Sequence, residues 1–404
     1  MKNTVSRELM FLVVVAFLFN MIGQVINPVL TLYMIDVGAS AVEVGLMLAV
    51  SFLVGVVARI PSGIASDRFG KTPIILIAFI TQFFSLVLLY IIPHPIWFYL
   101  VLGVQTLPMA LFWSPAAALA SDIAPLEKRG EAMGRYFTAF GLAMFLGPLL
   151  CSFLVAFLSY RTMLLVLLPL PLLSLVVFVK GGIARQNIAP TKQYNTSGDS
   201  VIHSLKTIFR SRNIKALYVT SILNAIPLAV FAAIFSIYAQ ETLFFTPTII
   251  SLLFTARGGA NALIRIPVGR ISDKIGSRKK PLIMSYILLA LVYFIISMTG
   301  NYFLLVLAMV VFGFGWGIRA AVGNTLLVES VNSENRGLAL SIYNTIFTTG
   351  QFLGSSLVGV MVPILTATEI FKLSSLYYLL GILILTIAVS EKTRAQPRGV
   401  TCSS

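Results

Sequence analysis

The chain has 404 residues, of which 58% are hydrophobic and 11% charged, and its formal net charge is +15. This balance excludes an ordinary soluble domain, which is about half apolar and about a quarter charged. The mean hydropathy of +0.95 instead predicts an integral membrane protein.

Apolar runs of about 20 residues, the length that crosses a bilayer as a helix, occur twelve times along the chain. The expected spans lie near residues 9–35, 41–62, 73–92, 95–124, 133–158, 162–181, 215–240, 246–267, 281–299, 302–331, 338–365 and 369–390. We therefore expect an all-α integral membrane fold of twelve transmembrane helices. An internal repeat, described below, predicts two six-helix bundles related by pseudo-two-fold symmetry.

The expected bundles divide the chain into two similar parts. Residues 1–181 would form the N-terminal bundle and residues 215–390 the C-terminal bundle. The polar, basic stretch 182–214 is expected to be a cytoplasmic linker with a short helix near 201–210. Residues 391–404 are expected to be a cytoplasmic tail.

Basic residues gather on one side of this arrangement, the side that carries both termini. The opposite side holds the two cations Arg161 and Lys372, with the four acids Asp36, Glu43, Glu241 and Glu369. This positive-inside asymmetry predicts a multi-pass protein of the cytoplasmic membrane with both termini in the cytoplasm. The basic charge is then a topology signal, and we expect no binding to nucleic acid.

Three amide side chains, Asn20, Gln24 and Asn27, share one helical face of the first expected span. Amides in membrane helices commonly form hydrogen bonds between helices. A stripe of three amides would also suit a face that lines an aqueous cavity. Both interpretations stay open, and the three residues are candidates for a substrate cavity.

A stretch of 13 residues that begins at Arg59 recurs at Arg265, 206 positions later. Arg, Pro, Gly, Ser, Asp, a basic residue and Gly keep the same internal spacing in both copies. We expect Pro61 and Gly63 to end the second span, and Gly70 to permit a short polar turn before the third.

The stretch resembles the loop motif between spans two and three of the major facilitator superfamily. The matching residues here are Gly63, Asp67, Arg68, Gly70 and Lys71. A degenerate copy stands between spans eight and nine, where that superfamily repeats it, at Gly269, Asp273, Lys274 and Gly276. The chain departs from the motif at Ala65, where the motif has Leu, and at Thr72, where it has a basic residue. The resemblance covers nearly the whole chain and implies a two-domain secondary transporter.

The same resemblance implies a cytoplasmic gate that locks the halves together in the outward-open state. Asp67 would face the helix that begins near Leu338, where the helix N-terminus favours an anion. Arg68 and Arg129 would pair with Asp122 or with the motif Asp itself. The candidate gate residues are Gly63, Asp67, Arg68, Gly70, Lys71, Asp122, Arg129, Asp273, Glu329 and Arg336. The alternative is that these charges only set the topology.

Small residues four apart in span five, Ala143 and Gly147, predict close helix packing. The segment resembles the span-five motif of the superfamily's antiporters. Cys151 and Ser152 stand where that motif has its closing glycines, which weakens the case for an exchanger.

Arg257 and Arg319 fall in the middle of expected spans eight and ten. An intramembrane charge costs about 2.5 kcal/mol or more unless it is partnered or wetted. All 14 acidic residues lie at or near span ends, so no carboxylate is expected beside these arginines. They either bond structural carbonyls or amides, such as Asn261 or Asn324, or form an electropositive cavity patch at similar depth, with Trp316. The patch would attract an anionic or carbonyl-rich substrate.

No phosphate-binding loop, cysteine framework or histidine cluster occurs in the sequence, so we expect neither an enzyme nor a bound cofactor or metal. We predict a secondary active transporter that moves a small organic solute by alternating access, with export of an amphipathic or anionic compound as the leading hypothesis. Import of an organic anion or a sugar, or passive flow through a channel, is the alternative. The expected partners are the substrate, the lipid bilayer and a proton as coupling ion, and we expect a monomer.

Overall fold

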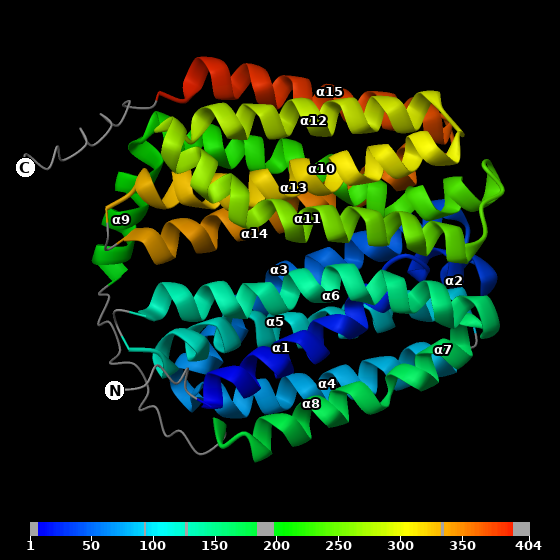
Figure 1. The fold of residues 1–404 in the computed structure, drawn as a ribbon, viewed down its shortest axis with the longest axis horizontal. Coiled ribbons are helices and arrows are strands. Elements are labelled where there is room, and N and C mark those ends of the chain that lie inside the picture. The colour runs from blue at the N-terminus through cyan, green and yellow to red at the C-terminus, as the bar shows by residue number, and fades with distance from the viewer. Residues whose placement is uncertain (1–6, 93, 126–127, 184–197, 333–334, 391–404) are drawn as a thin grey trace, which may run out of the picture.

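The structure is a computed structural model that describes residues 7–92, 94–125, 128–183, 198–332 and 335–390, and this part of the chain is helical apart from short connections (Figure 1). The helices are α1 (Arg7–Ile26), α2 (Leu30–Asp36), α3 (Ala41–Phe69), α4 (Lys71–Ile91), η1 (Pro95–Trp97), α5 (Phe98–Ile123), α6 (Arg129–Phe157), α7 (Tyr160–Leu167), α8 (Pro169–Lys180), α9 (Gly198–Arg210), α10 (Arg212–Glu241), α11 (Pro247–Ile275), α12 (Lys279–Met298), α13 (Tyr302–Glu329), α14 (Arg336–Met361) and α15 (Ala367–Ala388). The expected tail, 391–404, and residues 184–197 of the expected linker lie outside the described residues.

Ten helical segments of the described chain are long and apolar enough to cross a membrane, or eleven if the bent α11 counts as one crossing. The prediction of an all-helical membrane protein is confirmed. The expected span 338–365 overlaps α14, which is helical for 26 residues but rich in Ser, Thr, Asn and Gln. Apolarity therefore accounts for ten or eleven crossings and not for twelve. α14 packs against α3 and α10.

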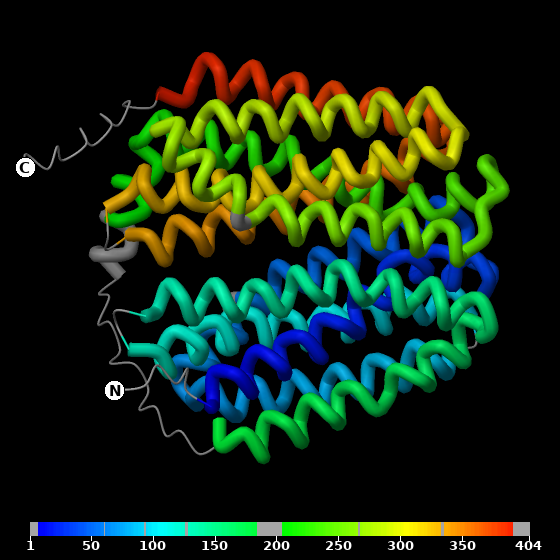
Figure 2. Tube along the Cα trace, in the orientation of Figure 1, coloured from blue at the N-terminus to red at the C-terminus, as the bar shows by residue number. Residues whose placement is uncertain are grey.

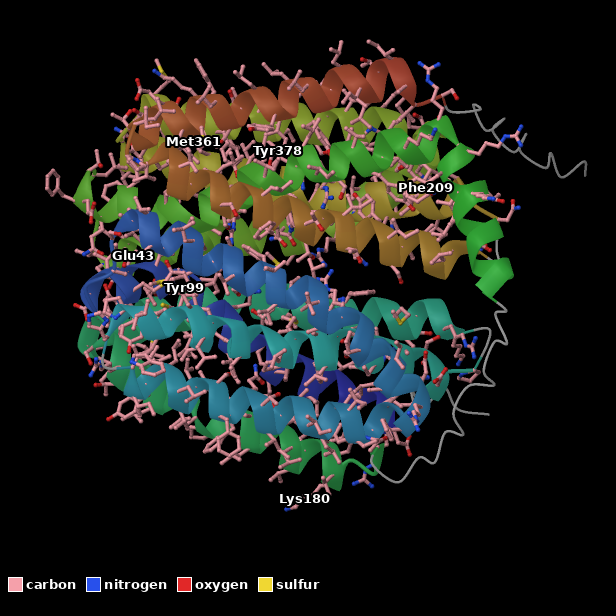
Figure 3. All side chains as sticks on the ribbon, turned by 180° about the vertical axis from the view of Figure 1, so that it is seen from behind. Glu43, Tyr99, Lys180, Phe209, Met361 and Tyr378 are labelled. Carbon is pink, nitrogen blue, oxygen red and sulfur yellow. The ribbon has the colours of Figure 1, made fainter. Side chains whose placement is uncertain are left out.

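The helices gather in two halves, with α1–α8 below and α10–α15 above in Figure 1. The halves meet mainly along two helix pairs, which we call the α6–α11 seam and the α3–α14 seam. We call the end at which α3 gives way to α4, and α11 to α12, the motif end, and the opposite end the distal end. Phe209 of α9 lies toward the motif end, and Glu43 and Met361 lie at the distal end (Figure 3).

The repeated sequence stretch forms a helix end. α3 runs through Pro61 and Gly63 to Phe69, and α4 begins at Lys71, so Gly70 is the one residue between the helices. Its φ of +91° is a backbone conformation that favours glycine. The prediction that Pro61 and Gly63 end the span is wrong, because a proline costs a helix one hydrogen bond without stopping the polar turns that follow.

The second copy behaves in the same way. α11 bends by 44° between Arg265 and Pro267 and continues to Ile275, a course that Figure 2 traces. Proline is a usual cause of a sharp helix bend, because its ring lacks a backbone donor and crowds the preceding turn. Gly276, with a left-handed φ of +66°, ends the helix.

Two distal helix starts are closed by their own side chains. Ser40 and Glu43 form a capping box at the start of α3, and Thr366 and Glu369 form another at the start of α15. Such reciprocal bonds satisfy backbone N–H groups that have no partner inside the helix. Two of the acids on this side of the molecule therefore have a structural role.

Prolines divide the first and sixth expected spans. Pro28 lies between α1 and α2, and its carbonyl accepts a hydrogen bond from Ser236 Oγ of α10 at 2.7 Å, which joins the two halves at the distal end. Pro169 opens α8 directly after Leu168, where α7 has ended.

The helix predicted near 201–210 is confirmed as α9, which extends from Gly198 to Arg210. Ile208 is buried, and the ring of Phe209 lies 5.7 Å from that of Tyr218 on α10. These contacts fix the end of α9 against the second half.

Glycines bring the seam helices together on the distal side. A Cβ on Gly45 would lie 3.0 Å from the carbonyl oxygen of Ser355, and a Cβ on Gly258 would overlap the carbonyl of Met144. Toward the motif end, each of the four seam helices has a glycine with nothing within 4 Å of an added Cβ, for example Gly63, Gly134, Gly269 and Gly337. The halves are therefore in close contact distally and part toward the motif end.

This contrast gives a stability test on one helix. We expect Gly258→Ala to lower the thermal unfolding midpoint of the detergent-solubilised protein, because α6 must move away from the new methyl group. Gly269→Ala, the control on α11, should keep or raise the midpoint, since Ala favours a helix by about 1 kcal/mol over Gly. Equal midpoints for the two variants would contradict the close packing of the α6–α11 seam.

Candidate functional site

Three phenylalanine rings surround the guanidinium of Arg257, in the middle of α11. Its Cζ lies 4.6 Å from the ring centre of Phe254, 5.2 Å from that of Phe231 and 5.3 Å from that of Phe312. Cation–π attraction of about 0.5–2 kcal/mol per ring offsets part of the cost of a charge in this position. Arg257 is half-buried and takes part in no hydrogen bond within the described chain. Its N–H donors therefore have no acceptor in the described chain.

No carboxylate lies in the interior of the described helices. Each Asp and Glu there lies within two residues of a helix end, as Asp67 and Asp273 do in the two motif copies. The sequence prediction of uncompensated interior arginines thus holds for this part of the chain. The interior carries a positive potential that protein acids do not cancel.

Arg319 lies in a more closed environment, with 5% of its surface exposed. Its Nη2 donates to the hydroxyl of Tyr343 on α14 at 2.8 Å, and its Cζ lies 5.1 Å from the ring of Trp316 and 4.9 Å from that of Phe347. Its Nε has no partner among the described residues. The expected amide partner Asn261 accepts instead from Arg265 Nε at 3.0 Å.

The register of α11 against α13 sets the depth of the two arginines. A Cβ on Gly313 would overlap the carbonyl of Arg257, and a Cβ on Gly317 would lie 3.1 Å from the carbonyl oxygen of Asn261. The two helices are therefore parallel, with Gly313 level with Arg257. Arg319 lies six residues after Gly313, so it is about 9 Å further along the axis than Arg257. The expectation that both lie at similar depth is wrong.

The three amides of α1 do not form one uniform water-facing stripe. Asn20 is 2% exposed, and its Nδ2 donates to the Ala16 carbonyl of its own helix at 2.7 Å. Gln24 and Asn27 are half-buried and lie one and four residues after Gly23, which is exposed and has open space around an added Cβ. A cavity-lining role therefore fits Gln24 and Asn27 better than Asn20.

The predicted gate residues of the first half form an ion pair between neighbouring helices. Lys71 Nζ bonds to Asp122 Oδ2 and so joins the start of α4 to the end of α5. The expected pairing of Arg68 or Arg129 with Asp122 is not formed in this structure. α3 stays helical through Arg68, whose guanidinium lies 5.4 Å from the ring of Phe69.

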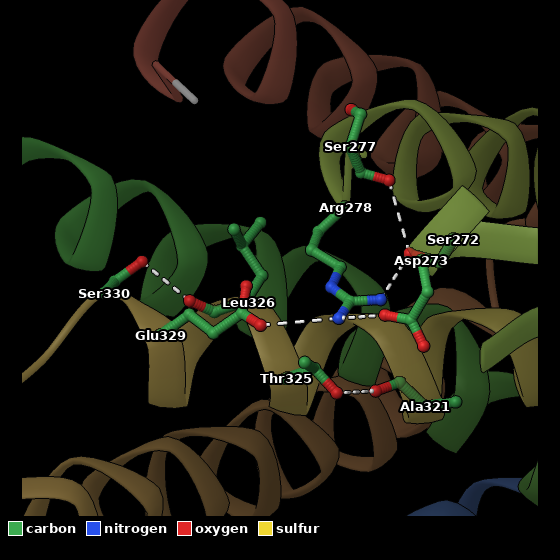
Figure 4. Close-up of polar contacts among 9 residues, drawn as sticks. All are labelled: Ser272, Asp273, Ser277, Arg278, Ala321, Thr325, Leu326, Glu329 and Ser330. Carbon is green, nitrogen blue, oxygen red and sulfur yellow. Dashed lines mark hydrogen bonds and ion pairs between the residues drawn. The ribbon is translucent and has the colours of Figure 1, made fainter. Parts of the chain in front are cut away.

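The second half has an equivalent cluster, shown in Figure 4. Arg278 Nη2 lies 2.6 Å from Asp273 Oδ1 and 3.4 Å from Glu329 Oε1. Its Nη1 donates to Ser272 Oγ at 2.9 Å. The sequence predicted the two acids but missed Arg278, because its counterpart in the first half is the uncharged Thr72.

Other predicted gate residues are exposed at the motif end. Asp67, Arg129 and Arg336 have no charged partner within the described chain. The expected contact between Asp67 and the helix near Leu338 is not formed in this structure. Gly337, at the start of α14, has nothing within 4 Å of an added Cβ.

Two polar contacts across the seams were not predicted. Ser251 Oγ of α11 lies 3.3 Å from Cys151 Sγ of α6, and both residues are buried. Arg59 Nη1 of α3 donates to the Asn344 carbonyl of α14 at 2.9 Å. The aromatic partners of the interior arginines did leave a sequence signal, because an aromatic residue stands three positions before each of them.

Two helical halves that adjoin at one end and part at the other, around an electropositive interior, are the architecture of a membrane transporter. The Major Facilitator Superfamily model matches residues 11–226 and 217–401. The chain belongs to this superfamily, and it is a multi-pass membrane transporter and not an enzyme, as the sequence predicted.

Known proteins match most of the chain. An uncharacterized MFS-type transporter of Methanocaldococcus jannaschii is 22% identical over 362 residues, 87% of this chain and 90% of that protein. The fold is similar to that of a POT family transporter in complex with 5-aminolevulinic acid, with a TM-score of 0.79, 14% identity and coverage of 95% of this chain and 96% of that one. It is also similar to the nucleoside transporter NupG, with a TM-score of 0.75, 14% identity and coverage of 95% and 100%. These two structural likenesses concern the fold alone.

The bond between Arg319 and Tyr343 gives a stability test. Tyr343→Phe removes an acceptor from a buried charge, and we expect the free energy of unfolding to fall by about 1.5–3 kcal/mol. Tyr136 supplies the control, because its buried hydroxyl has no partner in the described chain. Tyr136→Phe should leave the unfolding midpoint in the same detergent unchanged or raised. Equal losses in both variants would mean that the bond does not stabilise the protein.

Proposed function

We propose that this chain is a secondary active transporter that exports a small amphipathic organic anion across the cytoplasmic membrane by alternating access. Arg257 carries the proposal. Arg257 is half-buried as a residue, its guanidinium forms no hydrogen bond within the described chain, and no carboxylate of the described helices lies beside it, so an anionic group of the substrate is the partner that it lacks. The three surrounding phenylalanine rings favour an apolar part on the same molecule.

The other predicted cavity residues have supporting roles in this proposal. Gln24 and Asn27 line the first-half side of the cavity, and Asn20 lies behind them. Trp316 and Arg319 form the wall nearer the motif end. Arg319 is almost fully buried there, so it adds positive potential without direct contact with the substrate.

The proposal includes the topology. Twelve crossings, α14 among them, form two six-helix bundles with pseudo-two-fold symmetry. The motif end and both termini face the cytoplasm, in agreement with the bias of basic residues. With its distal seams closed and its motif end parted, the structure would then be the inward-facing state.

The exposed charges at the motif end act as the gate in this proposal. The pair of Lys71 with Asp122, and the Arg278 cluster, hold the helix ends rigid within each half. Asp67 and its exposed basic neighbours would meet the start of α14 when the motif end closes. Their present exposure supports this role, because they are free to make those contacts.

The proposal also covers direction and coupling. The loop motif favours export, and a proton is the coupling ion we propose. Import of an organic anion or a sugar is the second candidate.

Substitution of Arg257 tests the substrate class. We expect a panel of aliphatic and aromatic carboxylates to contain at least one that raises the unfolding temperature of the wild type. Arg257→Lys should weaken that anion's binding about tenfold, because a forked donor is lost. Arg257→Gln should weaken it by about 30-fold or more, which corresponds to 2 kcal/mol or more.

Arg135→Gln is the matched control, since it removes the same charge from an exposed pair with Glu131 at 2.7 Å. It should bind the anion as the wild type does. Normal anion binding by folded Arg257→Gln protein, or stabilisation of the wild type by sugars or lipophilic cations alone, would contradict the proposal.

A cross-link between the seams tests alternating access. In a Cys402→Ser background, Ser251→Cys should form an oxidant-induced disulfide with Cys151, because the two side chains already adjoin. The disulfide should stop transport in proteoliposomes, and reduction should restore it. A passive channel would keep conducting while cross-linked.

The labelling rate of a cysteine at the motif end, in the same cross-linkable protein, tests whether the gate opens and closes. Gly337→Cys should react fully with a soluble maleimide after cross-linking, since its surroundings are open in this structure. Without the cross-link it should react more slowly, because closure against Asp67 hides it part of the time. Identical rates in both conditions would contradict the proposed gate.

A further inference from the structure

A cluster of aromatic side chains in the first half takes no part in the gate or in the cavity around Arg257. The ring centre of Trp113 on α5 lies 5.1 Å from that of Phe140 and 6.1 Å from that of Phe137, both on α6. Tyr136 is buried beside them, with its ring centre 5.5 Å from that of Phe137. We call Trp113, Phe137 and Phe140 the aromatic shelf.

The aromatic shelf lies on the inner side of α6 and not on its lipid side. Phe137 shares a helical face with Gly141, where an added Cβ would lie 3.6 Å from α11 of the other half. Phe140 shares a face with Gly147, where an added Cβ would overlap α1. Because Trp113 contacts both rings, it covers the angle of α6 between α1 and α11.

The shelf is accessible because the halves part at its level. Phe137 is 36% exposed although it belongs to the face of α6 that packs against α11 further along the helix. Gly134, three residues closer to the motif end, has nothing within 4 Å of an added Cβ. Trp113 and Phe140 are half-buried. Aromatic surface is therefore open on the inner side of the α6–α11 seam.

Arg265 of α11 brings a cation to the edge of the shelf from the other half. Its Cζ lies 5.6 Å from the ring centre of Phe140. Its Nε donates to Asn261 Oδ1 at 3.0 Å, and Asn261 Nδ2 donates in turn to the carbonyl of Gly313 on α13 at 3.4 Å. These bonds hold the Arg265 side chain toward α13 and α6. The N–H donors on its two Nη atoms have no acceptor in the described chain.

No described carboxylate pairs with Arg265. Asp273, the one acid of α11, lies eight residues further on, about 12 Å by helix rise, and pairs with Arg278. Glu131, the one acid of α6, pairs with Arg135. Unpaired donors beside open aromatic rings suit a flat ring that carries an acceptor oxygen at its edge. A cationic ring would be repelled by Arg265.

We propose that the aromatic shelf and Arg265 form a subsite for an aromatic ring system of the transported solute. The ring lies against Trp113 and Phe137, and an oxygen at its edge accepts from Arg265. The subsite rests on the proposed function for the identity of its ligand as the cargo. Arg265 lies eight residues after Arg257, about 12 Å by helix rise, so a solute with its acid group at Arg257 and its ring at the shelf is an elongated aromatic acid.

A neutral probe tests the subsite without the charge that Arg257 would attract. 2-Naphthamide has a flat ring system and an amide oxygen at its edge, and decahydro-2-naphthamide has the same skeleton without aromatic faces. We expect 2-naphthamide to raise the unfolding temperature of the full-length protein in a neutral detergent. The hydrogenated analogue should need about fivefold more for half-saturation, because it loses the contact between aromatic rings.

Variants of the shelf locate the binding. Trp113→Ala should raise the half-saturating concentration of 2-naphthamide about tenfold and Phe137→Ala about fivefold, and both should remove the preference for the aromatic probe. Arg265→Met, which keeps an unbranched side chain without donors, should raise it about tenfold. Phe153→Ala is the matched control, because Phe153 is also on α6, is 62% exposed and points away from Phe137 by helical periodicity. It should stay within about twofold of the wild type.

Arg257→Gln separates the subsite from the proposed function. A neutral amide does not need that charge, so this variant should bind 2-naphthamide within about twofold of the wild type. If no carboxylate binds the wild type but 2-naphthamide binds and depends on Trp113, the proposed function fails and the subsite stands.

Several results would overturn the subsite. They are the absence of stabilisation of the wild type by 2-naphthamide, an equal response to its hydrogenated analogue, and an equal loss of 2-naphthamide affinity in Arg257→Gln or Phe153→Ala. Wild-type half-saturation in Phe137→Ala would do the same. That variant keeps the test valid where Trp113→Ala does not fold, since Phe137 is already exposed and its truncation leaves no buried cavity.

Discussion

The low polarity of the membrane interior constrains every charged group in this protein. A cation there needs partners, and the described chain offers it no interior carboxylate. Arg257 is surrounded by rings, and Arg319 by rings and one hydroxyl. Acids occur instead at the helix ends, where some of them cap helices and others form ion pairs, for example with Lys71 and Arg278. The low polarity of the membrane interior thus explains both why the acids lie at the helix ends and why the interior arginines need aromatic partners.

The two halves share a repeat but differ in what they contribute. The first half places amides along α1, whereas the second places two arginines in α11 and α13. The motif end shows the same difference, since Lys71 bonds to one acid and Arg278 lies between two. Close glycine contacts at Gly45 and Gly258 bring the halves together on the distal side of both seams. The two halves thus share a scaffold but place different polar side chains in the interior.

The sequence predicted the parts of the fold that depend on apolar length and repetition. Long apolar runs became helices, and the helix expected near 201–210 is present as α9. Helix boundaries at prolines were not predicted correctly, because Pro61 and Pro267 lie inside continuous helices. Composition alone cannot separate a proline that ends a helix from one that a neighbouring helix supports.

The site was predictable to the extent that charge alone identifies it. Two arginines in apolar surroundings could be found by inspection, but their different burial depends on the register of α11 against α13, which no local pattern encodes. The pairing of Lys71 with Asp122 depends likewise on a one-residue break at Gly70. The seam contact of Arg59 joins residues 285 positions apart and is a property of the assembled halves.

The polarity of α14 bears on how the protein is made. A segment with so many hydroxyl and amide groups gains little free energy by entering lipid alone. Its packing partners α3 and α10 precede it in the chain and are synthesised before it. Helices that are already in the bilayer can therefore assist the membrane insertion of α14, which is the later of the two seam helices of the second half.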